Sequence, residues 1–128
     1  AFAIPSFARQ VRAANKTGPR STLLVGDLNP VRDFSHVKDV ISAYRLLLER
    51  GVAGEAYNVC SGKERTIRSV LDELLDLAGV QADVRVDPSK LRPVDIPRLV
   101  GSAAKLRALG WEPRFTVRDA LRDLLGER

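Results

Sequence analysis

Methionine is absent from this 128-residue sequence, and cysteine and histidine each occur once. A single cysteine excludes an internal disulfide, which fits the reducing cytosol. One cysteine and one histidine cannot supply the ligands of a zinc site. No apolar run approaches the roughly 20 residues that a membrane-spanning helix needs. We therefore expect a cytoplasmic chain without a metal ion, and the missing methionine, even at position 1, favours a piece of a longer protein.

Residue patterns that would carry catalysis are also missing. The glycines are scattered, whereas a dinucleotide-binding turn needs closely spaced glycines after a strand. No tyrosine is followed by lysine four residues later. His36 has the chemistry of an acid or a base, but its position favours the start of a helix. A catalytic set can be written from Ser61, His36 and Asp39, although nothing in their spacing brings them together. The sequence thus predicts no catalytic residue.

Positive charge exceeds negative charge, with a formal net charge of +5 and a sequence pI of about 9.9. This balance favours anionic partners, from nucleotide phosphates to nucleic acids. Only Arg9, Arg12, Lys16 and Arg20 lack acidic neighbours. These four fit either a solvated helix face or the binding face of a stand-alone basic module for nucleic acid or nucleotides. No aromatic residues interleave with them as stacking platforms, which disfavours nucleic acid.

Alternating helical and short strand-like segments indicate an α/β chain, or a mixed α+β one. Helices are expected at residues 4–15, 36–49, 67–78, between Ser102 and Gly110 and after Thr116, and extended strands at residues 22–25, 32–34, 57–60 and 84–86. Thr66 and Ser102 are the expected caps of two helices, and Thr116 with Asp119 forms a capping box. Because the strands are few and short, we expect some of them to pair with a sheet that lies elsewhere.

The helix expected at residues 36–49 has its apolar residues on one face. They are Val37, Val40, Ile41, Tyr44, Leu47 and Leu48, which follow the helical 3, 4, 7 spacing. Such a face is typical of a helix that covers a core. Cys60 lies in the strand-like run that follows, where we expect a small buried hydrophobic residue rather than a nucleophile.

Two arginine motifs, about sixty residues apart, are the most informative feature of the sequence. One is GDLNPVRDF at residues 26–34, and the other is LRPVDIP at residues 91–97. Each places an arginine in a stretch punctuated by proline and aspartate, which is typical of a loop or a strand edge. Arginine grips phosphate through two parallel hydrogen bonds. Two arginines that converge on one pocket would suit a diphosphate.

Each motif also allows a purely structural interpretation. Asp33 is placed to pair with Arg32 and orient it, either as a phosphate clamp or as a salt bridge that ties a loop to the next helix. Arg92 precedes Pro93, which forces an extended backbone and aims the guanidinium outwards. Asp95 can accept hydrogen bonds from two ribose hydroxyls or can belong to a plain turn.

The residues around these motifs leave the same choice open. Lys90 and Arg98 raise the positive potential of the second motif, but we expect them to be solvated. Asn29 and Ser61 can contact a sugar or a base, or can form turns. Trp111 can stack on a base, although its position after a helix stop favours a core anchor.

Four segments together resemble the extended short-chain dehydrogenase/reductase family, in particular its nucleotide-sugar dehydratases, epimerases and reductases. They are GDLNPVRDF with the VKDV that follows, GEAYNVCSG at residues 54–62, LRPVDIP, and LGWEP at residues 109–113. Residues 4–10, 58–62 and 86–97 are most similar to the GDP-mannose branch. Within that branch they are more similar to the GDP-4-dehydro-6-deoxy-mannose reductases than to the GDP-mannose 4,6-dehydratases.

The resemblance implies that residues 1–128 form the C-terminal, nucleotide-sugar-binding domain of a Rossmann-type enzyme. An N-terminal half would bind NAD or NADP and carry the catalytic tyrosine and lysine, so this chain alone would catalyse nothing. The strand around Asn58 would join the sheet of that half. The same half makes the family's dimer contacts, so the whole protein is expected to be a homodimer and this chain a monomer.

The resemblance also assigns roles by position in the motifs. Arg32 and Arg92 would bind the diphosphate of a GDP-sugar, and Asp95 would bind its ribose. Asn29 and Pro5 would be further substrate contacts, with Pro5 near the base.

Overall fold

The structure is a computed structural model that describes residues 2–17, 21–91 and 96–126, without the side chains of residues 15–17. Its elements are α1 (Ala3–Thr17), β1 (Ser21–Val25), β2 (Val31–Asp33), α2 (Val37–Arg50), β3 (Glu64–Thr66), α3 (Ile67–Ala78), β4 (Ala82–Val86), the 3-10 helix η1 (Pro88–Lys90), β5 (Arg98–Leu99), α4 (Ala104–Ala108) and α5 (Val117–Leu125). This order confirms the α/β class. Within the described residues, no helix is long and apolar enough to cross a membrane.

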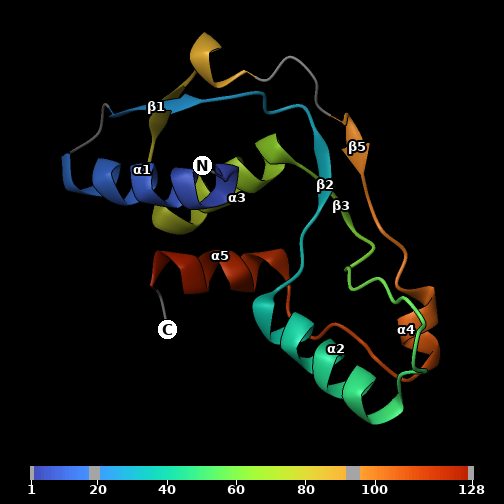
Figure 1. The fold of residues 1–128 in the computed structure, drawn as a ribbon. Helices are drawn as coiled ribbons and strands as arrows, with labels where there is room; N and C mark the ends of the chain where they lie inside the picture. Colours follow the sequence, from blue (N-terminus) through green and yellow to red (C-terminus); the bar gives the residue numbers. More distant parts are fainter. Residues whose placement is uncertain (1, 18–20, 92–95, 127–128) are drawn as a thin grey trace.

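The larger hydrophobic core lies between the parallel strands β1 and β4 and the helices α1, α3 and α5 (Figure 1). Leu23 of β1 pairs with Val84 of β4. Leu23 and Val25 are buried, whereas Thr22 and Leu24 are exposed. This alternation is that of a strand with one covered face. The strand predicted at residues 22–25 therefore forms one wall of this core.

Helix α3 begins and ends where the sequence predicts. Thr66 Oγ1 accepts the Ser69 N–H at 3.0 Å, and Gly79 ends the helix with a φ of 62°. Glycine suits this left-handed position because it has no Cβ. Between these ends, Leu71 and Leu74 have no exposed surface, since they face α1 and α5.

Strand β2 is the middle strand of a second sheet, with β3 antiparallel on one side and β5 parallel on the other. Arg32 and Asp33 are successive residues of β2, so their side chains leave opposite faces of the sheet. The Asp33 carboxylate accepts the N–H groups of Ser61 and Gly62 at 2.9 and 2.8 Å. The predicted pairing of Asp33 with Arg32 is therefore wrong, because the pleat separates the two side chains.

A smaller hydrophobic cluster surrounds Trp111. Its buried members are Ala43 of α2, Leu106 of α4, Ala103 and Trp111. Trp111 Nε1 donates to Ser42 Oγ at 3.0 Å and to the Asp39 carbonyl oxygen at 3.3 Å. Trp111 is therefore the core anchor that its position after the helix stop favours.

Two polar residues at the start of α2 hold the chain that leads into α5. Asp39, only 2% exposed, accepts the backbone N–H groups of Arg114 and Phe115 at 2.9 and 3.1 Å. His36 caps α2, as predicted, because its Nδ1 accepts the Lys38 N–H at 3.1 Å. The same imidazole stacks on Phe115, and its Nε2 lies 3.3 Å from Asp123 Oδ2 of α5.

Two local predictions are wrong. Residues 57–60 do not form a strand, and among the described residues no strand pairs with them. Helix α4 begins one residue later than expected, with Ala103 at the N-cap position. Ser102 Oγ only approaches the Ala104 N–H at 3.4 Å. The capping box predicted for α5, by contrast, is present, with Thr116 Oγ1 accepting the Asp119 N–H at 3.2 Å.

The apolar face predicted for α2 is mostly uncovered. Val37, Ile41, Tyr44 and Leu48 are 63, 61, 60 and 90% exposed. The helix instead covers the Trp111 cluster with Ala43, helped by Leu46 and Leu47. The apolar surface of α2 is thus larger than the part of it that packs against the rest of this chain.

We expect Asp39→Ala to lower the free energy of unfolding by about 2 kcal/mol, because it leaves two backbone N–H groups without their carboxylate acceptor. The matched control is Glu49→Ala, which removes a carboxylate from an exposed pair with Arg45 and should cost less than about 0.5 kcal/mol. Urea unfolding followed by Trp111 fluorescence measures both. Equal losses for the two variants would contradict the assignment.

Candidate functional site

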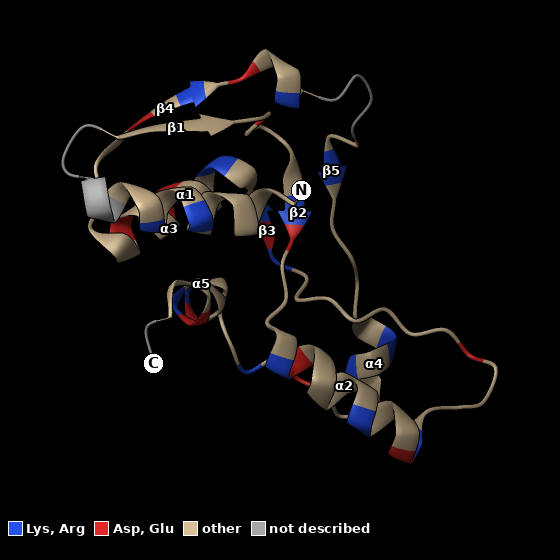
Figure 2. Cartoon of the chain, turned by 60° about the vertical axis from the view of Figure 1, so that its left-hand side comes forward, with Lys and Arg blue, Asp and Glu red and all other residues tan. Residues whose placement is uncertain are grey.

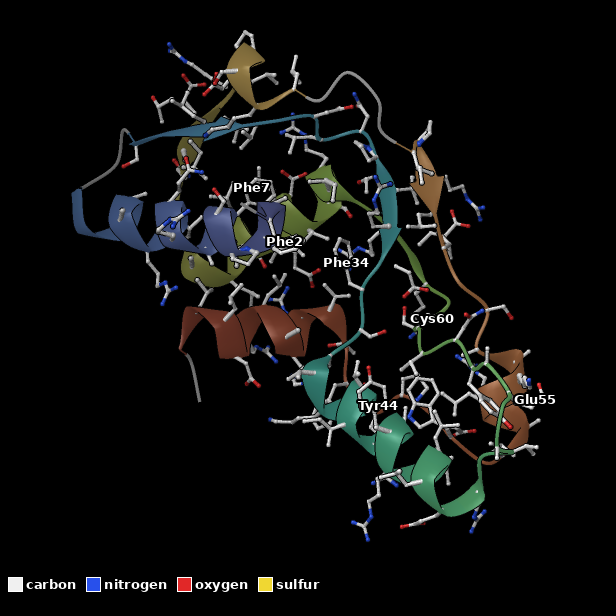
Figure 3. All side chains as sticks on the ribbon, in the orientation of Figure 1. Phe2, Phe7, Phe34, Tyr44, Glu55 and Cys60 are labelled. Atoms are coloured by element: carbon white, nitrogen blue, oxygen red, sulfur yellow. The ribbon has the colours of Figure 1, made fainter. Side chains whose placement is uncertain are left out.

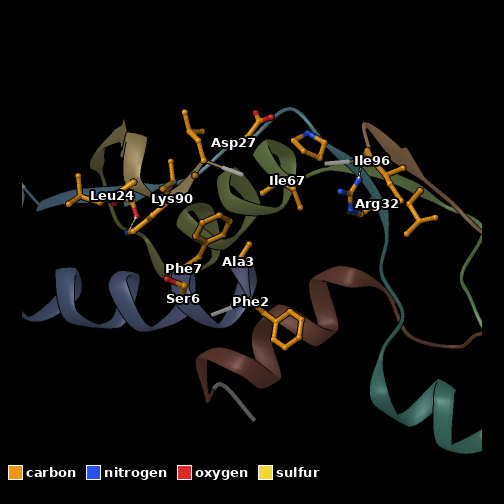
Figure 4. Close-up of a pocket in the computed structure, with 16 residues that line it drawn as sticks. Phe2, Ala3, Ser6, Phe7, Leu24, Asp27, Arg32, Ile67, Lys90 and Ile96 are labelled. Carbon is orange, nitrogen blue, oxygen red and sulfur yellow. Dashed lines mark hydrogen bonds between the residues drawn. The ribbon is translucent and has the colours of Figure 1, made fainter. Parts of the chain in front are cut away.

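A cavity of about 730 Å³ opens between the start of α1, the end of β1, strand β2, η1 and β5. Its lining mixes apolar and polar groups, and the apolar ones include Phe7, Val25 and Ile67 from three different elements. Phe2, 88% exposed, lies at its edge (Figure 4). A concave, mainly apolar site with a few polar groups is the usual form of a small-molecule site.

Arg32 lies at one end of this cavity, beside Ile96 (Figure 4). Its Nη1 donates to the carbonyl oxygens of Val31 at 2.8 Å and Ile96 at 2.7 Å. The bond to Ile96 joins β2 to the segment that precedes β5, and the two bonds together hold a half-buried guanidinium in the cavity lining. A guanidinium held in this way is pre-organised for an anion, because less side-chain freedom remains to be lost on binding.

Lys90 lies at the opposite end of the cavity (Figure 4). Its Nζ donates to the Leu24 carbonyl oxygen at 2.8 Å, which also accepts Gln10 Nε2 at 3.1 Å. The Lys90 side chain is nonetheless 42% exposed, as the expectation that it is solvated requires. The sequence could not reveal this contact, since its partner lies 66 residues away along the chain.

Gly26 sets how closely η1 approaches β1. A Cβ atom at this position would lie 3.0 Å from the Lys90 carbonyl oxygen, which is tighter than an ordinary contact. The glycine that begins the GDLNPVRDF motif thus leaves room for the backbone that carries Lys90. This close approach gives Gly26 a structural role that the spacing of the motif does not reveal.

The five predicted substrate contacts do not all lie at this cavity in the structure. Arg32 lines the cavity, whereas Asn29 and Pro5 are not among the lining residues. Asn29 forms a turn, donating its backbone N–H and its Nδ2 to Asp27 Oδ1, each at 2.9 Å. Arg92 and Asp95 lie outside the described residues.

Residues next to these predicted contacts do line the cavity. Asp27, the hydrogen-bond partner of Asn29, is one of them. Ser6, which follows Pro5 in α1, is another. Leu91 and Ile96 line it from either side of the segment that the structure does not describe. The sequence motifs therefore lie beside this cavity, although not every predicted side chain lines it.

The catalytic set written from Ser61, His36 and Asp39 is not assembled. Ser61 Oγ donates to Asp33 Oδ1 at 2.6 Å, while His36 faces Asp123. Each side chain is thus engaged with a different partner. Within the described parts of the chain, no group of three or more histidine, cysteine or acidic side chains could hold a metal ion.

Cys60 is half-buried beside the Trp111 cluster, in the segment that runs near α4 (Figure 3). Burial raises the pKa of its thiol above the ordinary value of 9.0, and the negative charge of Asp33 raises it further. A thiol with a raised pKa is protonated at neutral pH and is a poor nucleophile. This chemistry agrees with the packing role predicted from the sequence.

Arg9 and Arg12 of α1 are both exposed, and α1 contains no acidic residue. Arg12 Nε donates to the Ala8 carbonyl oxygen of its own helix at 3.4 Å. The side chain of Lys16 and all of Arg20 lie outside the described residues. Figure 2 shows acidic and basic residues interspersed along α2 and α5.

Residues 2–124 match the family model described as GDP-mannose 4,6 dehydratase, and the chain belongs to that family. It is 41% identical over 127 residues to GDP-6-deoxy-D-mannose reductase of Pseudomonas aeruginosa. That match covers 98% of this chain and 42% of the relative, so the chain spans about two fifths of the relative's length. The resemblance identified from the four segments is confirmed.

Solved structures agree with this assignment. The structure of RMD from Pseudomonas aeruginosa complexed with NADPH superposes with a TM-score of 0.89 at 41% identity, covering 98% of this chain and 41% of that one. The structure of UDP-glucose 4-epimerase from Thermotoga maritima with UDP-glucose gives 0.80 at 25% identity, covering 99% and 39%. The fold described above is therefore that of nucleotide-sugar enzymes over this part of their chains.

The residues of this chain do not fit the pyrophosphate of a dinucleotide such as NADPH. That group needs a glycine-rich turn from a strand into a helix. Strand β1 is followed by β2 rather than by a helix, and β2 leads into α2 through Phe34, Ser35 and His36, with no glycine. Arg32 and Lys90 line the cavity instead, and Lys90 Nζ also lies 3.9 Å from Asp87 Oδ2.

We expect Cys60 to react slowly with iodoacetamide at pH 7, because its raised pKa leaves almost no thiolate. The rate should rise with pH and continue to rise above pH 9.0, the ordinary value for the group. Mass-spectrometric counting of alkylated protein against time measures it, with free cysteine as the reference. A rate at pH 7 equal to that of free cysteine would contradict the protonated, half-buried thiol.

Proposed function

We propose that the cavity holds the diphosphate of a nucleotide sugar, with Arg32 as its main cationic contact. The observation that carries this proposal is the half-buried Arg32 guanidinium in the cavity lining, held by the carbonyl oxygens of Val31 and Ile96. A charge in a partly dehydrated cavity interacts more strongly with an anion than one in bulk water. Lys90 adds a second positive charge to the same lining.

The substrate that we propose is a GDP-linked sugar. Membership of the GDP-mannose 4,6 dehydratase family and the name of the Pseudomonas aeruginosa relative support this choice. The apolar lining around Phe7 and Ile67 suits the flat base and the sugar ring better than a second charged group. Dehydratases and epimerases that act on other nucleotide sugars are the alternatives within the same class.

The remaining predicted contacts keep their roles as proposals. Arg92 would be the second arginine on the diphosphate and Asp95 the acceptor of the ribose hydroxyls, since Leu91 and Ile96 on either side line the cavity. Asn29 would act through Asp27, whose carboxylate it holds. Pro5 would fix the first turn of α1, from which Ser6 lines the cavity.

In the whole protein we propose a reductase that transfers a hydride to a GDP-linked keto-sugar. NAD or NADP would supply the hydride and would be bound by residues outside these 128, as would the catalytic tyrosine and lysine. This chain would hold the diphosphate at a fixed position, orient the sugar and exclude water from one side of it. A cytoplasmic location and a homodimeric whole protein remain predictions.

A basic module for nucleic acid is the alternative from another class. The net charge of +5 and the exposed Arg9 and Arg12 of α1 favour it, but no aromatic residues interleave with these basic residues as stacking platforms. Nucleic-acid binding through phosphates weakens steeply with salt. The prediction of no nucleic-acid partner is therefore checked by the salt dependence of duplex DNA binding.

We expect Arg32→Ala to weaken GDP binding to the whole protein by on the order of 2–5 kcal/mol, because it removes a partly buried charge that contacts the diphosphate. The matched control is Arg45→Ala, which removes an arginine from α2 whose side chain is 83% exposed and pairs with Glu49. Arg32→Lys keeps the charge but loses the two-pronged geometry, and it should lie between the two. Calorimetry gives the dissociation constants.

Arg32 also holds the Ile96 carbonyl, so each variant needs a stability measurement. Urea unfolding separates a lost contact from a lost fold. Equal dissociation constants for Arg32→Ala and Arg45→Ala, with both variants folded, would show that the assignment of the clamp is wrong.

We expect the 128-residue chain by itself to turn over no GDP-keto-sugar with NADPH, because it contains no closely spaced glycines and no tyrosine followed four residues later by lysine. Loss of NADPH absorbance measures turnover, and the whole protein is the positive control. Turnover by the chain alone would refute the proposal that catalysis needs residues outside these 128.

We also expect no binding of duplex DNA at physiological salt. Tight, salt-dependent DNA binding would favour the basic module.

A further inference from the structure

Lys90 lines the cavity at the opposite end from Arg32 (Figure 4). Its Nζ donates to the Leu24 carbonyl oxygen at 2.8 Å and lies 3.9 Å from Asp87 Oδ2, which is too far for a hydrogen bond. An ammonium group has three N–H donors. Because the side chain is 42% exposed and lines the cavity, the N–H groups of Lys90 that Leu24 does not accept can reach a ligand there.

The backbone that carries Lys90 is fixed against the end of β1. The Asp87 N–H donates to the Val25 carbonyl oxygen at 2.8 Å, and the Asp87 carboxylate caps η1 by accepting the Ser89 N–H at 2.9 Å. Gly26 allows the Lys90 carbonyl oxygen to approach β1 closely. The ammonium is therefore presented from an ordered segment, which lowers the entropy that a ligand loses by ordering it.

The backbone of Leu24 has no hydrogen-bonding group left for a ligand. Gln10 Oε1 accepts the Leu24 N–H at 2.9 Å, and Gln10 Nε2 and Lys90 Nζ both donate to the Leu24 carbonyl oxygen. A carbonyl oxygen has two lone pairs, so both are used. The polar groups that line this end include the Lys90 ammonium and the Ser6 hydroxyl, whose oxygen lies 3.4 Å from Gln10 Nε2. This end of the cavity consequently favours ligand atoms that accept hydrogen bonds.

A nucleoside diphosphate carries its phosphates and its base on opposite sides of the ribose. With the diphosphate on Arg32, the base extends towards the end of the cavity that Lys90 lines. Phe7 and Leu24 belong to the same lining and offer apolar surface to a flat ring (Figure 4). The edge of a base that lies on this surface would then meet the ammonium.

We propose that Lys90 reads the base of the nucleotide sugar by donating to the O6 and N7 atoms of guanine. This inference rests on the proposed function, which places the diphosphate on Arg32. Guanine presents O6 and N7 as adjacent acceptors, which lysine commonly recognises. Adenine has an amine in place of O6, which would set donor against donor, and uracil and thymine have no N7. Lys90 is thus a specificity-determining residue, which selects the base rather than binding any diphosphate.

Base-exchanged diphosphates test this assignment in the whole protein. We expect Lys90→Ala to weaken the binding of GDP by about tenfold or more, which is the discrimination that a good contact to this edge provides. IDP keeps O6 and N7 and should be weakened equally, whereas the binding of ADP and UDP should be nearly unchanged. Calorimetry gives the dissociation constants.

Two further variants serve as controls. Lys90→Arg keeps a donor for O6 and N7 and should keep the preference for GDP. Lys63→Ala removes an exposed lysine that is not among the lining residues, and it should change the binding of none of the four diphosphates.

A second measurement uses the unaltered protein and does not depend on the folding of a variant. In 7-deaza-GDP a C–H group replaces N7, while the phosphates and O6 are unchanged. We expect this analogue to bind several-fold more weakly than GDP, because it loses one of the two acceptors that Lys90 contacts.

Either of two results would overturn the proposal. Equal weakening of GDP, ADP and UDP binding by Lys90→Ala would assign Lys90 to the phosphates. Equal binding of GDP and 7-deaza-GDP by the unaltered protein would exclude the contact with N7. Failure of the proposed function gives a different result, since GDP binding would then be insensitive to Arg32→Ala.

Discussion

The pleat of β2 is the constraint on which the arrangement of this chain depends. Because successive side chains leave opposite faces of a strand, Arg32 and Asp33 serve different parts of the molecule. Arg32 lies in the cavity lining, where it joins β2 to the segment before β5. Asp33 holds the Ser61–Gly62 backbone, which leads from the Trp111 cluster into β3. A one-residue shift of this strand would exchange the two charges.

Buried polar contacts, rather than a single large core, connect the two parts of the fold. Asp39 fixes the backbone at Arg114 and Phe115, and His36 ties the first turn of α2 to α5. Each contact joins residues more than seventy positions apart, and each places the Trp111 cluster relative to the core that contains α3 and α5. The cavity at the start of α1 and the exposed apolar face of α2 consequently belong to one connected framework.

Features that depend on neighbouring residues were predicted well from the sequence. Features that depend on contacts between distant segments were predicted less well. Thr66, Gly79 and the Thr116–Asp119 capping box mark helix ends that depend only on neighbouring residues, and all are present. The strand expected at residues 57–60 is absent, because a strand exists only beside a partner. Lys90 was missed as a cavity residue for a similar reason, since its partner Leu24 is distant in the sequence.

The sequence by itself determined the class of the fold, the caps of its helices and the family, because these follow from local propensities and from motifs in a fixed order. It also placed Arg32 in a motif that suits phosphate. Only the tertiary structure decided that Arg32 reaches a cavity and Asp33 does not, that Gly26 makes room for Lys90, and that the apolar face of α2 stays uncovered. The physical reason is that each of these outcomes depends on which distant segment packs beside the residue.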